Sequence, residues 1–553
     1  MKLKSALPLL LAALFIAPTF ASVAATYDDQ YSPIPAPAKN YQGYLLQESA
    51  EMTRFGSSLL NFTMSETGTV ETVTACSSLS SAGCTFTKRQ AYWAELGQCD
   101  TVNKVDCIVS VSAKDETGTA LAVEYLGIFP KEAPQDFVGD PSVNLPTGSE
   151  PLLVRIPGAP HPGGDLYLIK SEMIGDRVKS IGDKFRAIRF QTGIFAVSLI
   201  DGDYGYALQS TDPTQYPNEN WVIGGGKRDA GCAASSKTQC TMRYPLPQDI
   251  SFGLQLRLNT PIVGWLHGRM NSPEFSIETE PSGTKLLTIS AKPIKVPLID
   301  VWLSNDKFTP ALKEFYAGAT NSGSAYFGSK DLPLSEIALR RDGNSVNDAV
   351  AMKEFLAWLP VIGDKAQAMP TAWTLKTMKE DGGSASQCFA KAKGIAGVVS
   401  TNAAQYLDGP PTFNKSDGFL DYKVAAPHFT STGEVFKGSY DLVMSSDVAR
   451  CLYGFSNAPI GATVSIVSAD GEPSVATTLV REKNNWIFLQ ANNFTFSTPT
   501  VRVQFTQEAP AKPVIVPIAK VKKISITCVK GKTSKKITAI KPTCPPTYKK
   551  KVS

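Results

Sequence analysis

The sequence predicts a mainly β, multi-domain protein. Antiparallel β-sandwich domains are expected, with a short helical insertion, a C-terminal immunoglobulin-like (Ig-like) domain and a small basic tail. Three observations predict this class. Short β-branched and apolar runs recur along most of the chain, separated by Gly, Pro, Asn and Asp. Helical patterns are confined to one stretch near the middle. Ten regularly spaced cysteines are typical of disulfide-stabilised extracellular domains.

Residues 1–25 have the features of a secretory signal peptide. Lys2 and Lys4 precede the apolar segment 7–20, which is too short for an ordinary membrane span. Small residues lie before the expected cleavage point after Ala25. No later segment approaches 18 uninterrupted apolar residues, so no membrane span is predicted. The sequence therefore predicts a secreted protein at the extracellular cell surface.

The first predicted strands follow a proline-rich lead-in at residues 26–40. Residues 41–304 then contain repeated short strand-like runs, from which we predict one or two sandwiches. The clearest run is Phe252–Leu258, where apolar residues alternate with polar ones as in a half-buried strand.

Residues 305–385 change pattern and predict a helical connector. Thr309 and Pro310 are a typical helix start, with a capping residue followed by proline in the first turn. Ser345–Asp348 resembles a capping box and predicts a second helix that ends near Leu359.

Residues 386–508 return to six or seven short strand-like runs and predict the Ig-like sandwich. A Pro/Ala-rich linker at residues 509–520 follows. Residues 521–553 form a lysine-rich tail, in which Ile524, Ile526 and Cys528 alternate with polar residues as in a hairpin strand.

The cysteines are expected to form disulfides between neighbours, since three pairs each enclose seven polar, turn-like residues. The sequence alone also allows Cys76 to pair with Cys107 and Cys84 with Cys99. Metal thiolates are disfavoured because no C-x-x-C motif occurs and exported thiols oxidise. The predicted disulfides are Cys76–Cys84, Cys99–Cys107, Cys232–Cys240, Cys388–Cys451 and Cys528–Cys544.

Positive charge is concentrated at the C-terminal end. From Pro513 to Ser553 there are eleven lysines and no Arg, Asp or Glu. Since the whole chain carries +5 and the leader holds two lysines, residues 26–512 carry a net charge of −8. The simplest alternative to a function is a solvated end, but such charge density also predicts polyanion binding by counterion release. The predicted binding residues are Lys520, Lys522, Lys523, Lys530, Lys532, Lys535, Lys536, Lys541, Lys549, Lys550 and Lys551.

Several motifs resemble those of a family of secreted actinobacterial proteins. The stretch Asp447–Ser456 (DVARCLYGFS) and the closing Cys528–Lys532 (CVKGK) and Tyr548–Lys551 (YKKK) carry this resemblance, as do Gly264–Arg269 and Gly409–Asn414. The resemblance implies export and association with the cell envelope, but no activity or site. The abundant polyanions outside a Gram-positive cell are anionic cell-wall polymers, which lysine suits as a partner for diffuse charge attraction.

Motifs for catalysis and cofactors are largely missing from the sequence. Its three histidines are widely separated, and no G-x-S-x-G elbow or complete phosphate-binding loop occurs. Asp201 and Asp203 begin a partial calcium-loop pattern, but the twelfth position is Asp212 where a bidentate Glu is usual. We therefore predict no catalytic residue, cofactor or nucleotide partner.

These observations favour a non-enzymatic surface or binding protein, held to anionic wall polymers by its cationic tail. One alternative is a secreted hydrolase of polysaccharide or peptide, with paired carboxylates within residues 41–304. Another is an array of carbohydrate-binding modules, with tryptophans as sugar platforms and glycans as partners.

Overall fold

The computed structural model describes most of the chain and divides it into two compact units, Met1–Gln507 (the body) and Glu508–Ser553 (the tail unit). The predicted leader and most of the Pro/Ala linker lie outside the described residues. The described residues are 28–37, 39–48, 56–65, 70–131, 136–204, 206–207, 225–226, 231–317, 326–327, 338–343, 349–378, 386–392, 394–456, 460–467, 473–475, 477–496, 500–507 and 522–552.

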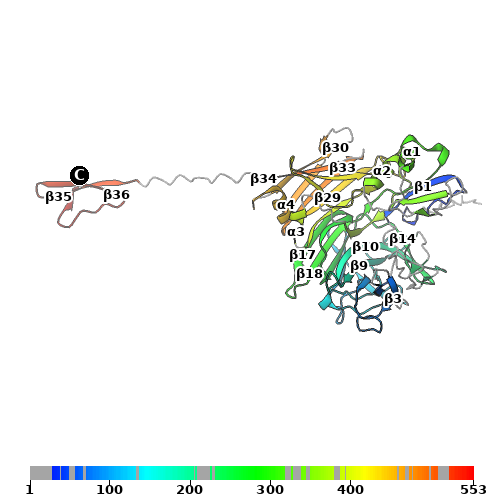
Figure 1. Cartoon of the computed structure of the whole chain (residues 1–553). Coiled ribbons are helices and arrows are strands. Elements are labelled where there is room, and N and C mark those ends of the chain that lie inside the picture. The colour runs from blue at the N-terminus through cyan, green and yellow to red at the C-terminus, as the bar shows by residue number, and fades with distance from the viewer. Residues whose placement is uncertain are drawn as a thin grey trace, which may run out of the picture. The chain divides into compact units, whose positions relative to one another are not determined.

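The body is organised around one sheet of fifteen described strands (Figure 1). Pairing is antiparallel except between β16 and β25, which are parallel. The main path contains β3 (Val70–Cys76), β2 (Ser58–Met64), β4 (Arg89–Glu95), β9 (Leu166–Val178), β10 (Arg186–Asp201), β24 (Thr374–Thr377), β16 (Gly264–Arg269), β25 (Ile395–Thr401), β29 (Lys437–Ser445), β33 (Trp486–Thr495) and β32 (Thr477–Lys483). Side branches add β7 (Glu124–Ile128), β8 (Leu152–Arg155), β13 (Cys232–Ser235) and β14 (Gln239–Tyr244).

A five-stranded sheet shares a hydrophobic core with this large sheet. Phe252, Leu254 and Leu256 of the predicted alternating strand point into that core together with Phe190 and Ile194 of β10. The apolar side chains that alternate along this strand are therefore the ones that are buried, as the alternation predicted. The strands, in order, are β17 (Asn271–Thr279), β18 (Lys285–Lys292), β15 (Ser251–Leu258), β5 (Cys107–Lys114) and β6 (Ala120–Leu121).

A six-stranded sheet contributes to the second large core. Alternate residues of the central strands point to opposite sides, since Val398 and Val443 join the first core whereas Val399 and Leu442 join the second. Covering both faces explains why every residue of β25 is buried. The strands are β26 (Gln405–Tyr406), β28 (Phe419–Ala425), β34 (Thr500–Gln507), β30 (Ile460–Val467) and β31 (Pro473–Val475), with β27 (Thr412–Asn414) beside β28.

Smaller elements complete the described body. A four-stranded sheet contains β20 (Ile299–Ser304), β1 (Tyr41–Leu46), β22 (Ala338–Gly343) and β21 (Tyr326–Phe327). Two strand pairs are β11 (Tyr206–Ala207) with β12 (Gly225–Gly226) and β19 (Ile294–Lys295) with β23 (Thr371–Ala372). The described helices are α1 (Pro310–Ala317), α2 (Ala349–Trp358), α3 (Ser386–Lys391) and α4 (Ser446–Tyr453), with 3₁₀ turns at Asp28–Gln30, Pro141–Val143 and Asn305–Lys307.

The predicted mainly β class, with antiparallel sheets and few helices, is confirmed. One sheet, however, runs through both predicted β regions, 41–304 and 386–508, and these lie in a single compact unit. Residues 305–385 hold α1 and α2 as predicted, but also β24, which lies between β10 and β16 inside the large sheet. A four-residue strand carries too little local pattern to reveal this pairing.

The N-terminal lead-in is held against the body at several points. Asp28 accepts a hydrogen bond from the Met369 N–H (2.8 Å), and Asp29 accepts one from the Thr371 N–H (3.0 Å). The Trp302 indole also donates to the Ile34 carbonyl. The described part of this segment is therefore an ordered strap on the body.

Candidate functional site

The tail unit is a three-stranded sheet built around β35 (Ile524–Lys530). β36 (Thr533–Ala539) pairs along its whole length, and β37 (Lys549–Lys550) pairs with Cys528 and Val529 on the other edge. Gly531 has φ +57°, a conformation that favours glycine, and it lies in the turn between β35 and β36. The hairpin predicted from alternation is present, and β37 is a third strand that the sequence did not reveal.

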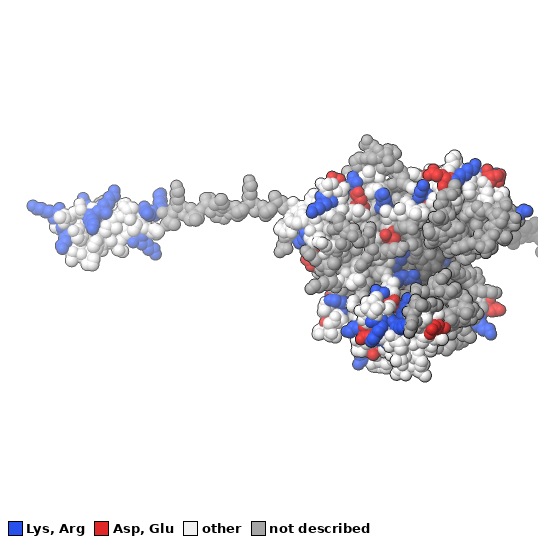
Figure 2. All heavy atoms as spheres, in the orientation of Figure 1, with Lys and Arg blue, Asp and Glu red and all other residues white. Residues whose placement is uncertain are grey.

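The lysines of the tail unit cover both faces of this small sheet. Lys535 and Lys550 lie directly opposite Cys528, whereas Lys536 lies opposite Thr527 and Lys549 opposite Val529 on the other face. Figure 2 shows lysines over the described surface of the tail unit, with no acidic residue among them. The exposed lysines are Lys522, Lys523, Lys530, Lys532, Lys535, Lys536, Lys541, Lys549, Lys550 and Lys551. Lys520 lies outside the described residues.

This arrangement suits attraction to a polymer more than recognition of one group. Only Ile526 and Cys528 of the described tail residues are buried, so the sheet has a minimal core. A sheet with so small a core is marginal in water, and the Cys528–Cys544 disulfide constrains it. Charges spread over two faces and held by a short cross-link form a compact polycation.

All ten cysteines pair with their neighbours, which selects one of the pairings that the sequence left open. Cys388–Cys451 joins α3 to α4 across 63 residues, and the other body disulfides close short loops. No cysteine is therefore available as a thiolate ligand or nucleophile.

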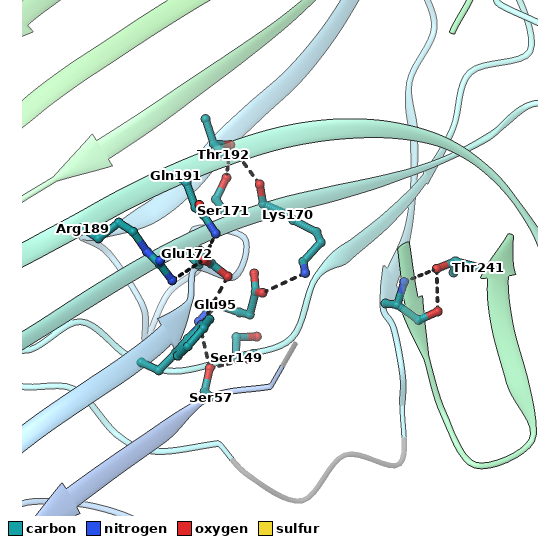
Figure 3. A network of polar contacts seen from close by, with 12 residues as sticks. Ser57, Glu95, Ser149, Lys170, Ser171, Glu172, Arg189, Gln191, Thr192 and Thr241 are labelled. Atoms are coloured by element: carbon teal, nitrogen blue, oxygen red, sulfur yellow. Dashed lines mark hydrogen bonds and ion pairs between the residues drawn. The ribbon is translucent and has the colours of Figure 1, made fainter. Parts of the chain in front are cut away.

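A second cluster of chemically notable residues lies inside the body, and sequence reasoning missed it. Strand register places Glu95 of β4 opposite Glu172 of β9, and Glu172 opposite Gln191 of β10. Lys170, two residues from Glu172, reaches the Glu95 carboxylate at 3.7 Å (Figure 3). Glu150 lies in the loop before β8. The three glutamates and the lysine are all at most 1% exposed.

We call Glu95, Glu150, Lys170 and Glu172 the carboxylate cluster. Hydrogen bonds and an ion pair hold the Glu172 side chain in place. Glu172 accepts a hydrogen bond from the Trp93 indole at 3.3 Å. It also accepts one from the Gln191 amide and forms an ion pair with Arg189 at 3.6 Å (Figure 3). Both Glu150 carboxylate oxygens, in contrast, are buried and have no hydrogen-bond partner among the described residues.

Burial dominates the electrostatics of the cluster. Burial, together with the charges of Glu95 and Asp136 and against the opposing charge of Lys170, raises the pKa of Glu150 to about 9. Burial and the charge of Glu95 likewise raise the pKa of Glu172 to about 8. The pKa of Glu95 is also raised by burial, against the opposing effect of Lys170. Like charges on facing strands repel, so the cluster favours protonated carboxyls at neutral pH.

The carboxylate cluster is enclosed in the body and lacks the solvent access that an active site needs. Its side chains have almost no contact with solvent, so a polymer substrate cannot reach them. The cluster can hold protons, and its chemical consequence is a pH-dependent stability of the body.

The partial calcium-loop residues and the tryptophans were the remaining candidates from the sequence. Asp201 ends β10 and is exposed, with its carboxylate accepting from the Gln239 amide at 2.9 Å. Asp203 is also exposed, and Asp212 lies outside the described residues. Among the described residues no group of three His, Cys, Asp or Glu is arranged to hold a metal ion. Trp265 and Trp373 are at most 2% exposed, so neither is a sugar platform.

Two of the three histidines are also buried in the body. His161 lies in a turn closed by backbone hydrogen bonds with Gly164, and its Nε2 is 2.9 Å from the Leu166 carbonyl oxygen. His267 stacks on Tyr406 with ring centroids 3.6 Å apart, and burial lowers its pKa well below the ordinary value.

None of the described helices is long and apolar enough to cross a membrane. A scan against protein-family models found no match, and a search of curated proteins found no similar protein.

Proposed function

We propose that this chain is a secreted, non-enzymatic surface protein that its basic tail unit holds to anionic cell-wall polymers. The observation that carries the proposal is the compact tail unit, whose described lysines are all exposed and whose described residues include no carboxylate side chain. The five disulfides fit an oxidising, extracellular location.

Charge attraction of this kind has a measurable signature. Each polymer phosphate that a lysine neutralises releases a counterion, so binding weakens steeply with salt. By analogy with nucleic acids, six such contacts lower the affinity about 10³-fold between 50 and 200 mM salt. Because lysine attracts as a point charge, the binding should depend on the number of charges more than on their order.

The test compares the mature full chain with a variant in which six tail lysines are replaced by glutamine. These positions are exposed, so the replacement leaves the disulfide and the small core in place. The tail positions are Lys522, Lys523, Lys535, Lys536, Lys549 and Lys550. A matched control replaces six exposed body lysines, Lys114, Lys131, Lys184, Lys237, Lys423 and Lys437.

The assay is sedimentation with purified Gram-positive cell walls, before and after removal of their phosphate polymers. The full chain and the body control should sediment with untreated walls in low salt and dissociate in high salt. The tail variant should remain in solution. Equal sedimentation of the tail variant and the full chain would contradict the proposal, as would undiminished binding to stripped walls.

A further inference from the structure

A surface pocket with a volume of about 280 Å³ lies on the body between β17 and the strands β29, β32 and β33. Figure 1 shows β17 beside the large sheet near β29. The pocket contains both a buried carboxyl group and an exposed apolar side chain. Its lining includes Ser272, Glu274, Asp441, Leu479, Arg481 and Gln490.

Strand register assembles one wall of this pocket. Asp441 of β29 lies opposite Gln490 of β33, and Gln490 lies opposite Leu479 of β32. Directly opposed residues share a face of the sheet, so a carboxyl, an amide and an apolar side chain form one row. In the neighbouring row Arg481 lies opposite Phe488 and covers its ring at 4.2 Å.

A β-bulge in β17 forms the other wall. The pairing with β18 shifts between Asn271 and Glu274, and Ser272 within the bulge has φ +55°. Bulges redirect side chains, and non-glycine residues rarely adopt this conformation. The bulge aims the Ser272 N–H at Asp441 (3.3 Å), and the Ser272 hydroxyl accepts from the Gln490 amide (2.5 Å).

Asp441 is the chemically distinctive group of the pocket. It is 3% exposed, and burial raises its pKa to about 7, with only the Ser272 N–H acting in the opposite direction. The other charged residues of the pocket lining are Glu274 on β17 and Arg481 on β32. Glu274 forms ion pairs with Arg481 and, at 3.9 Å, with Lys483. Near neutral pH, Asp441 can therefore donate a hydrogen bond as an acid.

We propose that this pocket binds a neutral sugar ring, whose hydroxyls bond to Asp441, Gln490 and Ser272 while its apolar face packs on Leu479. Sugar rings combine closely spaced hydroxyls with an apolar face. The pocket offers convergent amide, hydroxyl and carboxyl groups beside a leucine that is 61% exposed. The site is independent of the tail lysines, and it gives the body a ligand of its own.

The experiment applies the mature full chain to an array of neutral oligosaccharides of glucose, mannose and N-acetylglucosamine, followed by calorimetric titration. We expect binding to at least one oligosaccharide class, and a loss of about fivefold or more in affinity on Leu479→Ala, because the pocket loses its apolar contact. Ile188→Ala, at a site 58% exposed on β10, is the matched control and should bind unchanged.

The variant Asp441→Asn tests whether the protonated acid binds the sugar, because a purely structural role of Asp441 would not change how affinity depends on pH. If the protonated acid binds the sugar, the apparent affinity of the unmodified chain falls with the protonated fraction, by about tenfold between pH 6 and pH 8. The asparagine amide donates at both pH values, so the affinity of Asp441→Asn should stay constant. The proposal is overturned if no neutral oligosaccharide binds at millimolar concentration, if Leu479→Ala binds unchanged, or if the affinity of the unmodified chain is the same at both pH values.

Discussion

Replacing Glu150 by glutamine should stabilise the body at neutral and alkaline pH. Glu150 is fully buried, and within the described part of the chain neither carboxylate oxygen has a hydrogen-bond partner. Glutamine has nearly the same shape and stays neutral, so it removes the ionisation without opening a cavity. Near pH 4.5, where the carboxyl is largely neutral, the two proteins should have similar free energies of unfolding.

The direction of this pH dependence follows from the number of protons bound in the folded and unfolded states. Burial raises the pKa of Glu150 in the folded protein to about 9, from an ordinary value of 4.5. Between these values the folded state holds a proton that the unfolded state has lost. The free energy of unfolding therefore falls as pH rises from 4.5 to about 9, and the contribution is constant above that pH.

The magnitude comes from the same shift. Each pH unit in this range changes the free energy of unfolding by about 1.4 kcal/mol, so the three units between pH 4.5 and 7.5 amount to about 4 kcal/mol. The unmodified protein should lose this amount over that interval relative to Glu150→Gln. The curves of stability against pH should therefore diverge as pH rises.

The assay is urea unfolding followed by tryptophan fluorescence at half-unit steps from pH 4.5 to 9, with Glu71→Gln as the control. Glu71 is an exposed glutamate on β3 and should leave the curve unchanged. Parallel curves for Glu150→Gln and the unmodified protein would show that Glu150 takes up no proton on folding, and would refute this reasoning.

Two further variants test the fold. Replacing Cys528 and Cys544 by serine should lower the free energy of unfolding of the tail unit by about 3 kcal/mol, because the disulfide joins residues 16 positions apart. Limited proteolysis should then cleave the tail faster. Unchanged cleavage would contradict the stabilising role of the disulfide. Gly397→Ala should cost about 1 to 3 kcal/mol because its Cβ would lie 2.4 Å from the Trp265 ring, measured as a shift of the urea midpoint. Gly182→Ala has open space around it and is the control, so equal shifts for both would count against the packing argument.

The elements that sequence reasoning predicted are those with a strong local signal. Alternation in Phe252–Leu258 matches β15, and Pro310 begins α1. The tail hairpin follows its alternating residues and Gly531. Helix α4, within the DVARCLYGFS motif, was missed because it is short and lies among strands. The predicted capping box at Ser345–Asp348 lies outside the described residues.

The candidate sites divide in the same way. The tail lysines were predictable because charge and short spacing are properties of the sequence itself. The carboxylate cluster was not, because Glu95 and Glu172 are far apart along the chain and meet only through the register of β4 and β9. The pocket at Asp441 also depends on the register of three strands and on a bulge.

By itself, the sequence determined the mainly β class, the separation of charge between body and tail, and the cysteine spacings that favour neighbour pairing. The tertiary structure decided that one sheet joins both β regions, which carboxyls are buried, and where a pocket opens. The physical reason is that burial and pairing depend on strand register, which is set by contacts between residues distant in the chain. Composition and local alternation carry no information about those contacts.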